Sequence, residues 1–267
     1  MCALGDLLLD VVVRVDGPVE PDSEATAVTR TGAGGQSANV AAWAASLGAT
    51  ARFIGKRALD AAGELAAAEL ASRGVEVLGP TVSGRNGVVV SLVGPDGART
   101  MLSDRGVAPD LRAEELEMAW FRGCDRLHLS GYALLRSPVD EAAAKAAGAV
   151  REQGGRVSVD LSTASGIRAF GPKRLLRRLE LLEPDVVFAT EEELIALGTQ
   201  QPPAPTLVVK RGARGCVVDG KEIPAVDVEA VDSTGAGDAL AAGFLVGGPE
   251  LAVEAAARCV AKLGAMP

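Results

Sequence analysis

The chain has 267 residues, of which 48% are hydrophobic and 3% aromatic, and its formal net charge at pH 7 is −8. A chain of this length can bury a large core, and an acidic chain without a dense basic cluster does not favour nucleic acid as a partner. No apolar run approaches the ~20 residues of a membrane span, and four dispersed cysteines with one histidine disfavour disulfide staples and a structural zinc site. We therefore expect a cytoplasmic protein that acts on a small molecule.

The first part of the chain alternates between strand and helix patterns. Residues 2–13 are rich in Val and Leu and predict a strand buried on both faces, and residues 16–31 predict short exposed strands. Helical spacing begins at Asn39 and is stopped by Gly48. A strand at 50–54, a helix at 60–73 and a strand at 75–78 follow.

Residues 86–103 interrupt this alternation. Strand patterns at 86–93 and 98–103 flank Gly94-Pro95-Asp96-Gly97, which is a strong turn signal. Together with residues of about 14–31, this hairpin is expected to form a small separate sheet. We expect a single domain over residues 1–267, because no long polar linker divides the chain.

Alternation resumes in the second half of the chain. Strands are predicted at 125–130, 156–160, 185–189 and 206–210, helices at 137–153, 171–182 and 191–198, a hairpin at 215–225, and two closing helices at 236–247 and 250–263. Such a pattern predicts an α/β fold with a mostly parallel sheet covered by helices on both faces.

The segment Asp232-Ser233-Thr234-Gly235-Ala236-Gly237-Asp238 carries the clearest chemical signal. Its glycines lie where a loop enters an apolar, buried helix, whose first N–H groups lack partners and can bind a phosphate. Asp238 lies beside these donors, where a carboxylate can accept the proton of an attacking hydroxyl. Alternatively, Asp238 is only a helix-start carboxylate favoured by the helix dipole.

Two familiar phosphate loops are missing from the sequence. No Gly-x-x-x-x-Gly-Lys-Ser/Thr occurs, and Gly32-Ala33-Gly34-Gly35-Gln36-Ser37 lacks the third glycine of a dinucleotide-binding fingerprint. A nucleotide-dependent dehydrogenase is therefore disfavoured.

Taken together, the motifs resemble the ribokinase-like (PfkB) carbohydrate kinase family. Asp232 to Asp238 resembles its C-terminal signature, and Gly32 to Ala41 its N-terminal Gly-Gly signature. Supporting pieces follow the family's order: Gly5 to Asp10, Gly97 to Thr100, Asp104 to Gly106, and Val208 to Gly215. The resemblance implies a ribokinase-like three-layer fold with a small β-sheet lid, and ATP-dependent phosphorylation of a sugar, nucleoside or polyol hydroxyl.

The resemblance also implies a role for each site residue. Asp238 would be the catalytic base, with Gly235, Ala236 and Gly237 as an anion hole. The substrate would be held by Asp10, Gly34, Gly35 and Asn39, and the nucleotide by Lys210, Gly212, Gly215 and Thr190. Glu193 matches a residue of the magnesium water shell, and Asp232 and Thr234 match positions near a monovalent-cation site that K⁺ would occupy.

Structural explanations compete with several of these roles. Asn39 could cap a helix that starts at Val40. Thr190 and Glu193 have the spacing of a capping box, and Asp10 could be a polar residue at a strand end. His128 is expected to be a structural residue, either satisfied or partly exposed. The cysteines at 124, 216 and 259 are expected in the core, and Trp43 and Trp120 are expected to serve packing.

The sequence departs from the family pattern at three positions. Gln36 stands where some sugar kinases carry Lys, Thr190 replaces an Asn, and Ser162 replaces the Asn of an Asp-x-Asn motif. The departures at Gln36 and Thr190, together with the short segment that follows Leu263, motivate a second hypothesis, a ligand-binding or regulatory protein on a kinase scaffold.

Two further expectations concern the lid. Its edges and apolar face would be covered if two lids paired, which predicts a homodimer. Arg99 or Arg105 could meet an anionic substrate, or could be a surface charge.

Overall fold

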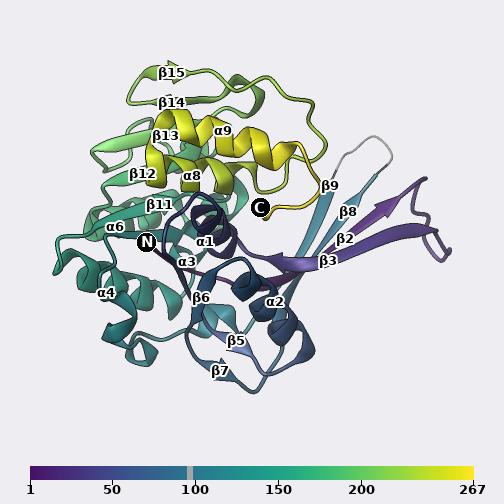
Figure 1. The fold of residues 1–267 in the computed structure, drawn as a ribbon, viewed down its shortest axis with the longest axis horizontal. Helices are drawn as coiled ribbons and strands as arrows, with labels where there is room; N and C mark the ends of the chain where they lie inside the picture. Colours follow the sequence, from purple (N-terminus) through teal and green to yellow (C-terminus); the bar gives the residue numbers. More distant parts are fainter. Residues whose placement is uncertain (95–98) are drawn as a thin grey trace.

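The computed structural model describes residues 1–94 and 99–267, and its core is built on one large sheet (Figure 1). The strands of this sheet are β1 (Cys2–Leu4), β4 (Ala51–Ile54), β6 (Val75–Leu78), β10 (Arg126–Ser130), β11 (Arg156–Asp160), β12 (Val186–Thr190), β13 (Thr206–Lys210), β14 (Cys216–Val218) and β15 (Lys221–Ile223). Their order is β15-β14-β13-β12-β11-β10-β1-β4-β6. The pairs from β6 to β13 are parallel, whereas β14 and β15 pair antiparallel at one edge.

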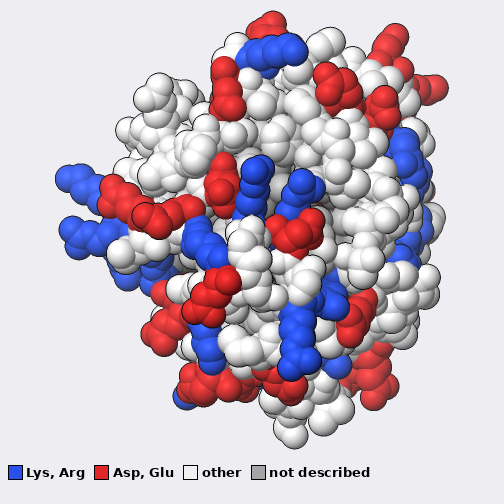
Figure 2. All heavy atoms as spheres, turned by 60° about the vertical axis from the view of Figure 1, so that its left-hand side comes forward, with Lys and Arg blue, Asp and Glu red and all other residues white. Residues whose placement is uncertain are grey.

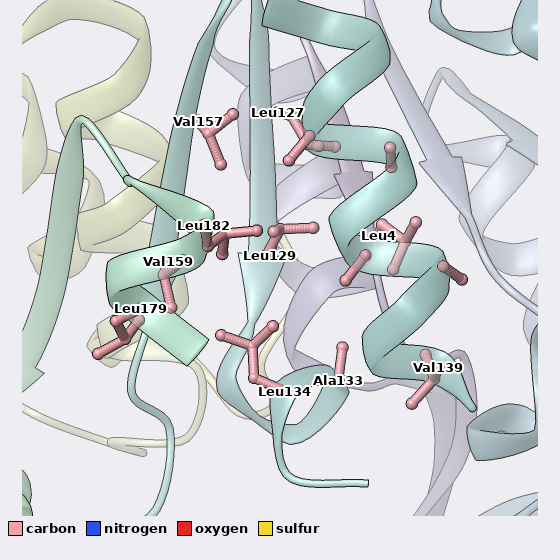
Figure 3. Packing of buried hydrophobic residues seen from close by; sticks show 14 of the residues in the cluster. Leu4, Leu127, Leu129, Ala133, Leu134, Val139, Val157, Val159, Leu179 and Leu182 are labelled. Atoms are coloured by element: carbon pink, nitrogen blue, oxygen red, sulfur yellow. The ribbon is translucent and has the colours of Figure 1, made fainter. Parts of the chain in front are cut away.

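Helices cover both faces of this sheet. One face carries α1 (Gln36–Ser46), α2 (Ala61–Ser72), α8 (Ala236–Gly247) and α9 (Pro249–Val260); the other carries α3 (Gly131–Leu134), α4 (Val139–Arg151), α5 (Ala164–Phe170), α6 (Pro172–Leu182) and α7 (Glu191–Leu197). Alternate strand residues feed the two layers, so Val187 belongs to one core cluster and Phe188 to the other. Figure 3 shows Leu127, Leu129 and Val159 among the residues of the α4 and α6 layer. The predicted three-layer arrangement is confirmed.

A second, four-stranded sheet forms the lid. It contains β2 (Leu8–Val15), β3 (Ala27–Gly34), β8 (Asn86–Val93) and β9 (Arg99–Gly106) in the order β3-β2-β8-β9, and it extends away from the body in Figure 1. The predicted lid hairpin is therefore present, although residues 95–97 of its expected turn lie outside the described residues.

The prediction of one strand over residues 2–13 is wrong. The chain leaves the main sheet after Leu4 and enters the lid at Leu8, so the Val- and Leu-rich run is divided between two sheets. A Cβ at Gly5 would lie 2.5 Å from the Ser37 hydroxyl oxygen, so the break occurs where the backbone approaches α1 closely. Residues 16–26 contain no strand, and the expected short strands of 16–31 reduce to β3.

Helix α1 begins earlier than predicted. Its N-cap is Gly35, with φ of 101°, so Asn39 lies inside the helix and the capping hypothesis for Asn39 is wrong. The short helices α3 and α5 were not predicted, because four or seven residues are too few to show a helical period. Minor elements complete the description: β5 (Arg57–Ala58), β7 (Thr81–Val82), and 3₁₀ turns at Ala108–Asp110, Ala113–Glu115, Met118–Phe121 and Gly212–Arg214.

Cys124, Cys216 and Cys259 lie in the core, as predicted, and His128 and Cys2 lie there too. His128 is fully buried with Nδ1 3.1 Å from the Ser158 hydroxyl, and burial lowers its pKa to about 4. All four cysteines are buried free thiols. Trp43 is buried, and its indole N–H donates to the carbonyl of Ala265.

The surface charges are mixed. On the face shown in Figure 2, Lys and Arg side chains are interspersed with Asp and Glu. Across residues 1–94 and 99–267, no helix combines the length and apolarity needed to cross a membrane.

Candidate active site

A cleft of about 1100 Å³ lies where the lid meets the carboxyl ends of the central strands. This edge of a parallel sheet is where α/β proteins bind ligands. The lid lines it with Leu8, Asp10, Val89, Met101, Ser103 and Arg105. The loop before α8 adds Ser233, Thr234 and Gly235, and the first turn of α8 adds Asp238. Gly35, Gln36, Asn39, Ser130, Tyr132 and Ser162 are among the residues that the body contributes.

Asp238 lies in the first turn of α8 and lines this cleft. Its Oδ2 accepts a hydrogen bond of 2.8 Å from the Asn39 side-chain nitrogen. Burial raises the pKa of Asp238 to about 7, an effect that Asp160 strengthens and that Asn39 and Lys210 oppose. The carboxyl group is thus poised to exchange a proton near neutral pH.

Gly235 and Gly237, which precede Asp238, are constrained by their surroundings to different degrees. Gly235 has φ of 76°, and a Cβ there would lie 2.6 Å from Cβ of Ala265, so the fold itself requires glycine. A Cβ at Gly237 would lie no closer than 3.4 Å to Lys210, which is an ordinary contact. Packing therefore does not explain Gly237, whose small size keeps the first-turn N–H groups of α8 open to a ligand.

Asn39 lines the cleft and carries a buried hydrogen-bond acceptor that is unused. The residue is only 6% exposed, and its Oδ1 has no hydrogen-bond partner in the described part of the chain. A buried carbonyl without a donor is costly, and a ligand hydroxyl would satisfy it.

Asp10 lies in β2 on the lid side of the cleft. Burial, aided by Glu69, raises its pKa to about 6. A Cβ at Gly34 would lie 2.1 Å from Cγ of Asp10, so Gly34 makes room for this carboxyl group. Gly35 lines the cleft itself and has a backbone conformation that suits glycine.

Lys210 points into the protein. Its Nζ lies 2.6 and 2.8 Å from the two carboxylate oxygens of Asp160, which is fully buried. Burial by itself would lower the pKa of Lys210, but Asp160 and Glu193 raise it overall. This buried ion pair was not predicted, because residues 50 positions apart give no local signal.

The capping box of α7 is confirmed. Thr190 Oγ1 accepts from the Glu193 N–H at 3.2 Å, and Glu193 Oε2 accepts from the Thr190 N–H at 2.8 Å. Burial raises the pKa of Glu193, which lies near Asp160 and Lys210. Within the described residues no group of three or more His, Cys, Asp or Glu side chains has the arrangement of a metal site.

Gly212 and Gly215 form the turn between β13 and β14. Both have positive φ, of 58° and 83°, and a Cβ at Gly215 would lie 2.1 Å from the Ile223 carbonyl oxygen. The geometry of the turn thus accounts for Gly215 without a ligand.

The segment 263–266 packs against the loop that precedes α8. This contact was not predicted from the sequence. Asp232 accepts from the N–H groups of Thr234 at 2.7 Å and Gly264 at 3.0 Å. The Cys259 thiol donates to the Thr234 carbonyl at 3.2 Å. These contacts hold the loop that leads to Gly235.

Arg105 joins the lid to the body. Its guanidinium donates to both carboxylate oxygens of Asp6, at 2.5 and 2.9 Å, and lies 5.7 Å from the Tyr132 ring centre. Arg105 is therefore a paired, partly buried charge, so the expectation of a surface charge is wrong. The side chain of Arg99 lies outside the described residues.

Ser162 connects several parts of the cleft. Its hydroxyl donates to Gln36 Oε1 and accepts from the Gly131 N–H at 2.8 Å, and its own N–H donates to Asp160 at 2.9 Å. Gln36 and Ser162 were noted in the sequence only as departures from a pattern.

Comparison with known proteins identifies relatives over the whole chain. The family described as pfkB family carbohydrate kinase matches residues 1–266. An ATP-dependent ribose-1-phosphate kinase of Halopiger xanaduensis is 35% identical over 96% of this chain and 88% of its own length. An Escherichia coli fructokinase is 32% identical over 91% of this chain and 82% of its own. The crystal structure of adenosine kinase from Sinorhizobium meliloti superposes with a TM-score of 0.88 and 25% identity, covering 100% of this chain and 95% of that one.

Proposed function

Because the chain belongs to the pfkB family of carbohydrate kinases, we propose that it transfers the γ-phosphoryl group of ATP to a sugar hydroxyl that lies against Asp238. The observation that carries this proposal is the pairing of Asp238 with Asn39 in the cleft. Asp238 is a carboxyl group with a pKa of about 7, and the neighbouring Asn39 Oδ1 lacks a donor. A substrate with two adjacent hydroxyls satisfies both groups.

Asp238 and the turn before it have separate roles in the proposed phosphoryl transfer. Asp238 accepts the proton of the attacking hydroxyl, whose oxygen forms a bond to the γ-phosphorus while the bond to the β–γ bridging oxygen breaks. The N–H groups around Gly235, Ala236 and Gly237, at the positive end of α8, stabilise the charge on the transferred group. Asp238 leaves the step protonated.

Substrate contacts are assigned to the lid side and to α1. Asp10 accepts from sugar hydroxyls, and Asn39 accepts through Oδ1. Gly35 would contact the substrate through its backbone where it lines the cleft, and Gly34 makes room for Asp10. The lid sheet then covers the sugar from the open side.

Nucleotide and cation contacts are assigned to the opposite side of Asp238. Thr190, Gly212 and Gly215 lie at the ends of β12 and β13 and would border the nucleotide, with Lys210 behind Gly237. Glu193, which is buried near the Asp160–Lys210 ion pair, is the residue that would hold Mg²⁺ through water, and Mg²⁺ would neutralise phosphate charge. Asp232 and Thr234 border the segment where K⁺ would bind; replacing K⁺ by choline in the assay tests this assignment.

One observation favours an acceptor that carries a phosphate. Arg174 lines the cleft with its guanidinium 4.3 Å from the Phe170 ring centre, and no carboxylate of the described chain pairs with it. Arg105, in contrast, is neutralised by Asp6. A free cation fixed on an aromatic ring suits an anionic substituent, as in the substrate named for the Halopiger relative.

A homodimer through the lid is also proposed. Val28 and Met101 lie on the same face of the lid, on β3 and β9, and are 70% and 60% exposed. Pairing of two lids would bury them and cover strand edges. Light scattering at micromolar concentration should give twice the chain mass, and a monomer would contradict this assignment.

A substrate panel tests the proposed function. The wild type and Asp238→Asn are incubated with ATP, Mg²⁺ and ribose, fructose, adenosine or ribose-1-phosphate. ATP-dependent phosphorylation of at least one acceptor by the wild type, and its loss in the variant, is expected. Tight binding of one compound without phosphoryl transfer would instead support the regulatory hypothesis.

A further inference from the structure

Two cleft residues without a part in the chemistry above contact each other. Gln36 is the first residue of α1, and Ser162 follows the end of β11. The Ser162 hydroxyl donates to Gln36 Oε1, and both side chains line the cleft together with Asp238. This contact joins the end of β11 to the helix that also carries Asn39.

The hydrogen bonds of the Ser162 hydroxyl restrict where its proton can go. Ser162 has φ of 69°, which is uncommon for serine, and its Oγ accepts from the Gly131 N–H. A hydroxyl has a single proton to donate. The acceptors in reach are Gln36 Oε1 and the Asp160 carbonyl oxygen at 3.0 Å. Gln36 is therefore the side chain that Ser162 can orient.

Orienting Gln36 has a consequence for Asp238. A side-chain amide carries its oxygen on one side and its NH₂ group on the other. With Oε1 on Ser162, the NH₂ group is left to face the cleft that Gln36 lines together with Asp238, and the Gln36 amide opposes the rise in the pKa of Asp238. Asn39 donates to the same carboxylate from three residues further along α1, on the same face of the helix.

We propose that Gln36 is a positioning residue for Asp238 and that Ser162 acts on Asp238 through Gln36. The proposal rests on the proposed function, in which Asp238 is the base. Two amides from one face of α1 limit rotation of the carboxylate and stabilise its ionised form. Ser162 keeps one of these amides from turning its oxygen toward the carboxylate.

Other charged groups also act on Asp238. Asp160 faces it from β11 and Lys210 from β13, and the charge of Asp238 influences the titration of Tyr132 on α3 and Cys259 on α9. Substitutions at Gln36 and Ser162 leave these groups in place. Any change in the titration of the base then comes from the amide.

The test is a pH profile of kcat/KM for Gln36→Met, Ser162→Ala and the double variant. Gln36→Met keeps the size of the side chain but removes a donor to the ionised base, so the acidic limb should move up by roughly one pH unit. Gln36→Glu should move it further, because it adds a like charge. Ser162→Ala should move it less than Gln36→Met, and should add nothing in the Gln36→Met background.

Gln153→Met is the matched control. The Gln153 amide donates to the carbonyls of Phe121 and Ala149, remote from the cleft, so this variant loses amide hydrogen bonds but should keep the wild-type profile. An unshifted acidic limb in Gln36→Met, or additive shifts in the double variant, would overturn the proposal. Full turnover by Asp238→Asn would instead overturn the proposed function, so the two failures are distinguishable.

Discussion

The side-chain nitrogen of Asn39 lies 2.8 Å from Oδ2 of Asp238, although 199 residues separate them in the sequence. Asn39 belongs to α1 and Asp238 to the first turn of α8, and these helices pack on the same face of the main sheet (Figure 1). The two glycine-rich motifs therefore meet at one carboxylate. Substitutions at this carboxylate test its part in catalysis separately from its part in folding.

Asp238→Asn should reduce kcat by roughly 10²- to 10⁴-fold, the usual contribution of a general base. Asparagine keeps the shape of the side chain but cannot accept the hydroxyl proton. ATP affinity, measured by calorimetry, should stay near that of the wild type. Turnover within tenfold of the wild type would exclude Asp238 as the base.

Stability and activity should respond to pH in opposite directions. The pKa of Asp238 is raised from 3.8 to about 7, so the folded chain holds this proton more tightly than the unfolded chain. The contribution of Asp238 to the free energy of unfolding therefore falls as pH rises through this interval. In contrast, kcat/KM should rise with pH up to about 7, because the base must be ionised.

Urea unfolding at several pH values checks the stability prediction. Asp238→Asn should show a flatter dependence than the wild type. Asp10, with its pKa raised to about 6, contributes a similar slope and remains in the variant. Identical slopes for the wild type and the variant would contradict the prediction.

The sequence was informative where a function depends on neighbouring residues. The loop before α8 and the capping box at Thr190 were predicted because their contacts span a few positions. Gln36 and Ser162 were visible only as departures from a pattern, and their contact spans 126 residues. The ion pairs Asp6–Arg105 and Asp160–Lys210 were missed for the same reason. Strand 2–13 was misjudged because an apolar run does not reveal that the chain changes sheets.

Lys210→Met should lower the free energy of unfolding by about 3–5 kcal/mol, because it leaves the fully buried Asp160 carboxylate without its cation. The double variant Lys210→Met/Asp160→Asn should recover part of this loss, since no buried charge is then unpaired. Urea unfolding measures both. A single variant within ~1 kcal/mol of the wild type would contradict the prediction.

Asp6→Asn should loosen the lid. It removes the charge that holds the partly buried Arg105 of β9, so the free energy of unfolding should fall by about 3 kcal/mol and KM for the acceptor should rise. Arg85→Gln is the matched control, because its pair with Asp104 is exposed and 3.7 Å long. Equal effects of the two variants would show that the Asp6 pair does not anchor the lid.

Arg174→Gln should raise KM for ribose-1-phosphate by roughly tenfold or more, the value of a hydrogen bond to a charged group. KM for ribose and for ATP should not change. Arg177→Gln, an exposed arginine on α6 outside the cleft lining, is the control. A rise in KM for ATP instead would assign Arg174 to the nucleotide.

The contact of residues 263–266 with the loop at Asp232 has a consequence for synthesis of the protein. The N–H of Gly264 and the side chain of Ala265 reach this loop, and the Ala265 carbonyl accepts from Trp43 on α1. A nascent chain that has not reached residue 264 lacks these contacts, even though Asp238 and both glycine-rich motifs have been translated. The turn before α8 therefore reaches its final arrangement only after residues 264 and 265 have been synthesised and can pack on it.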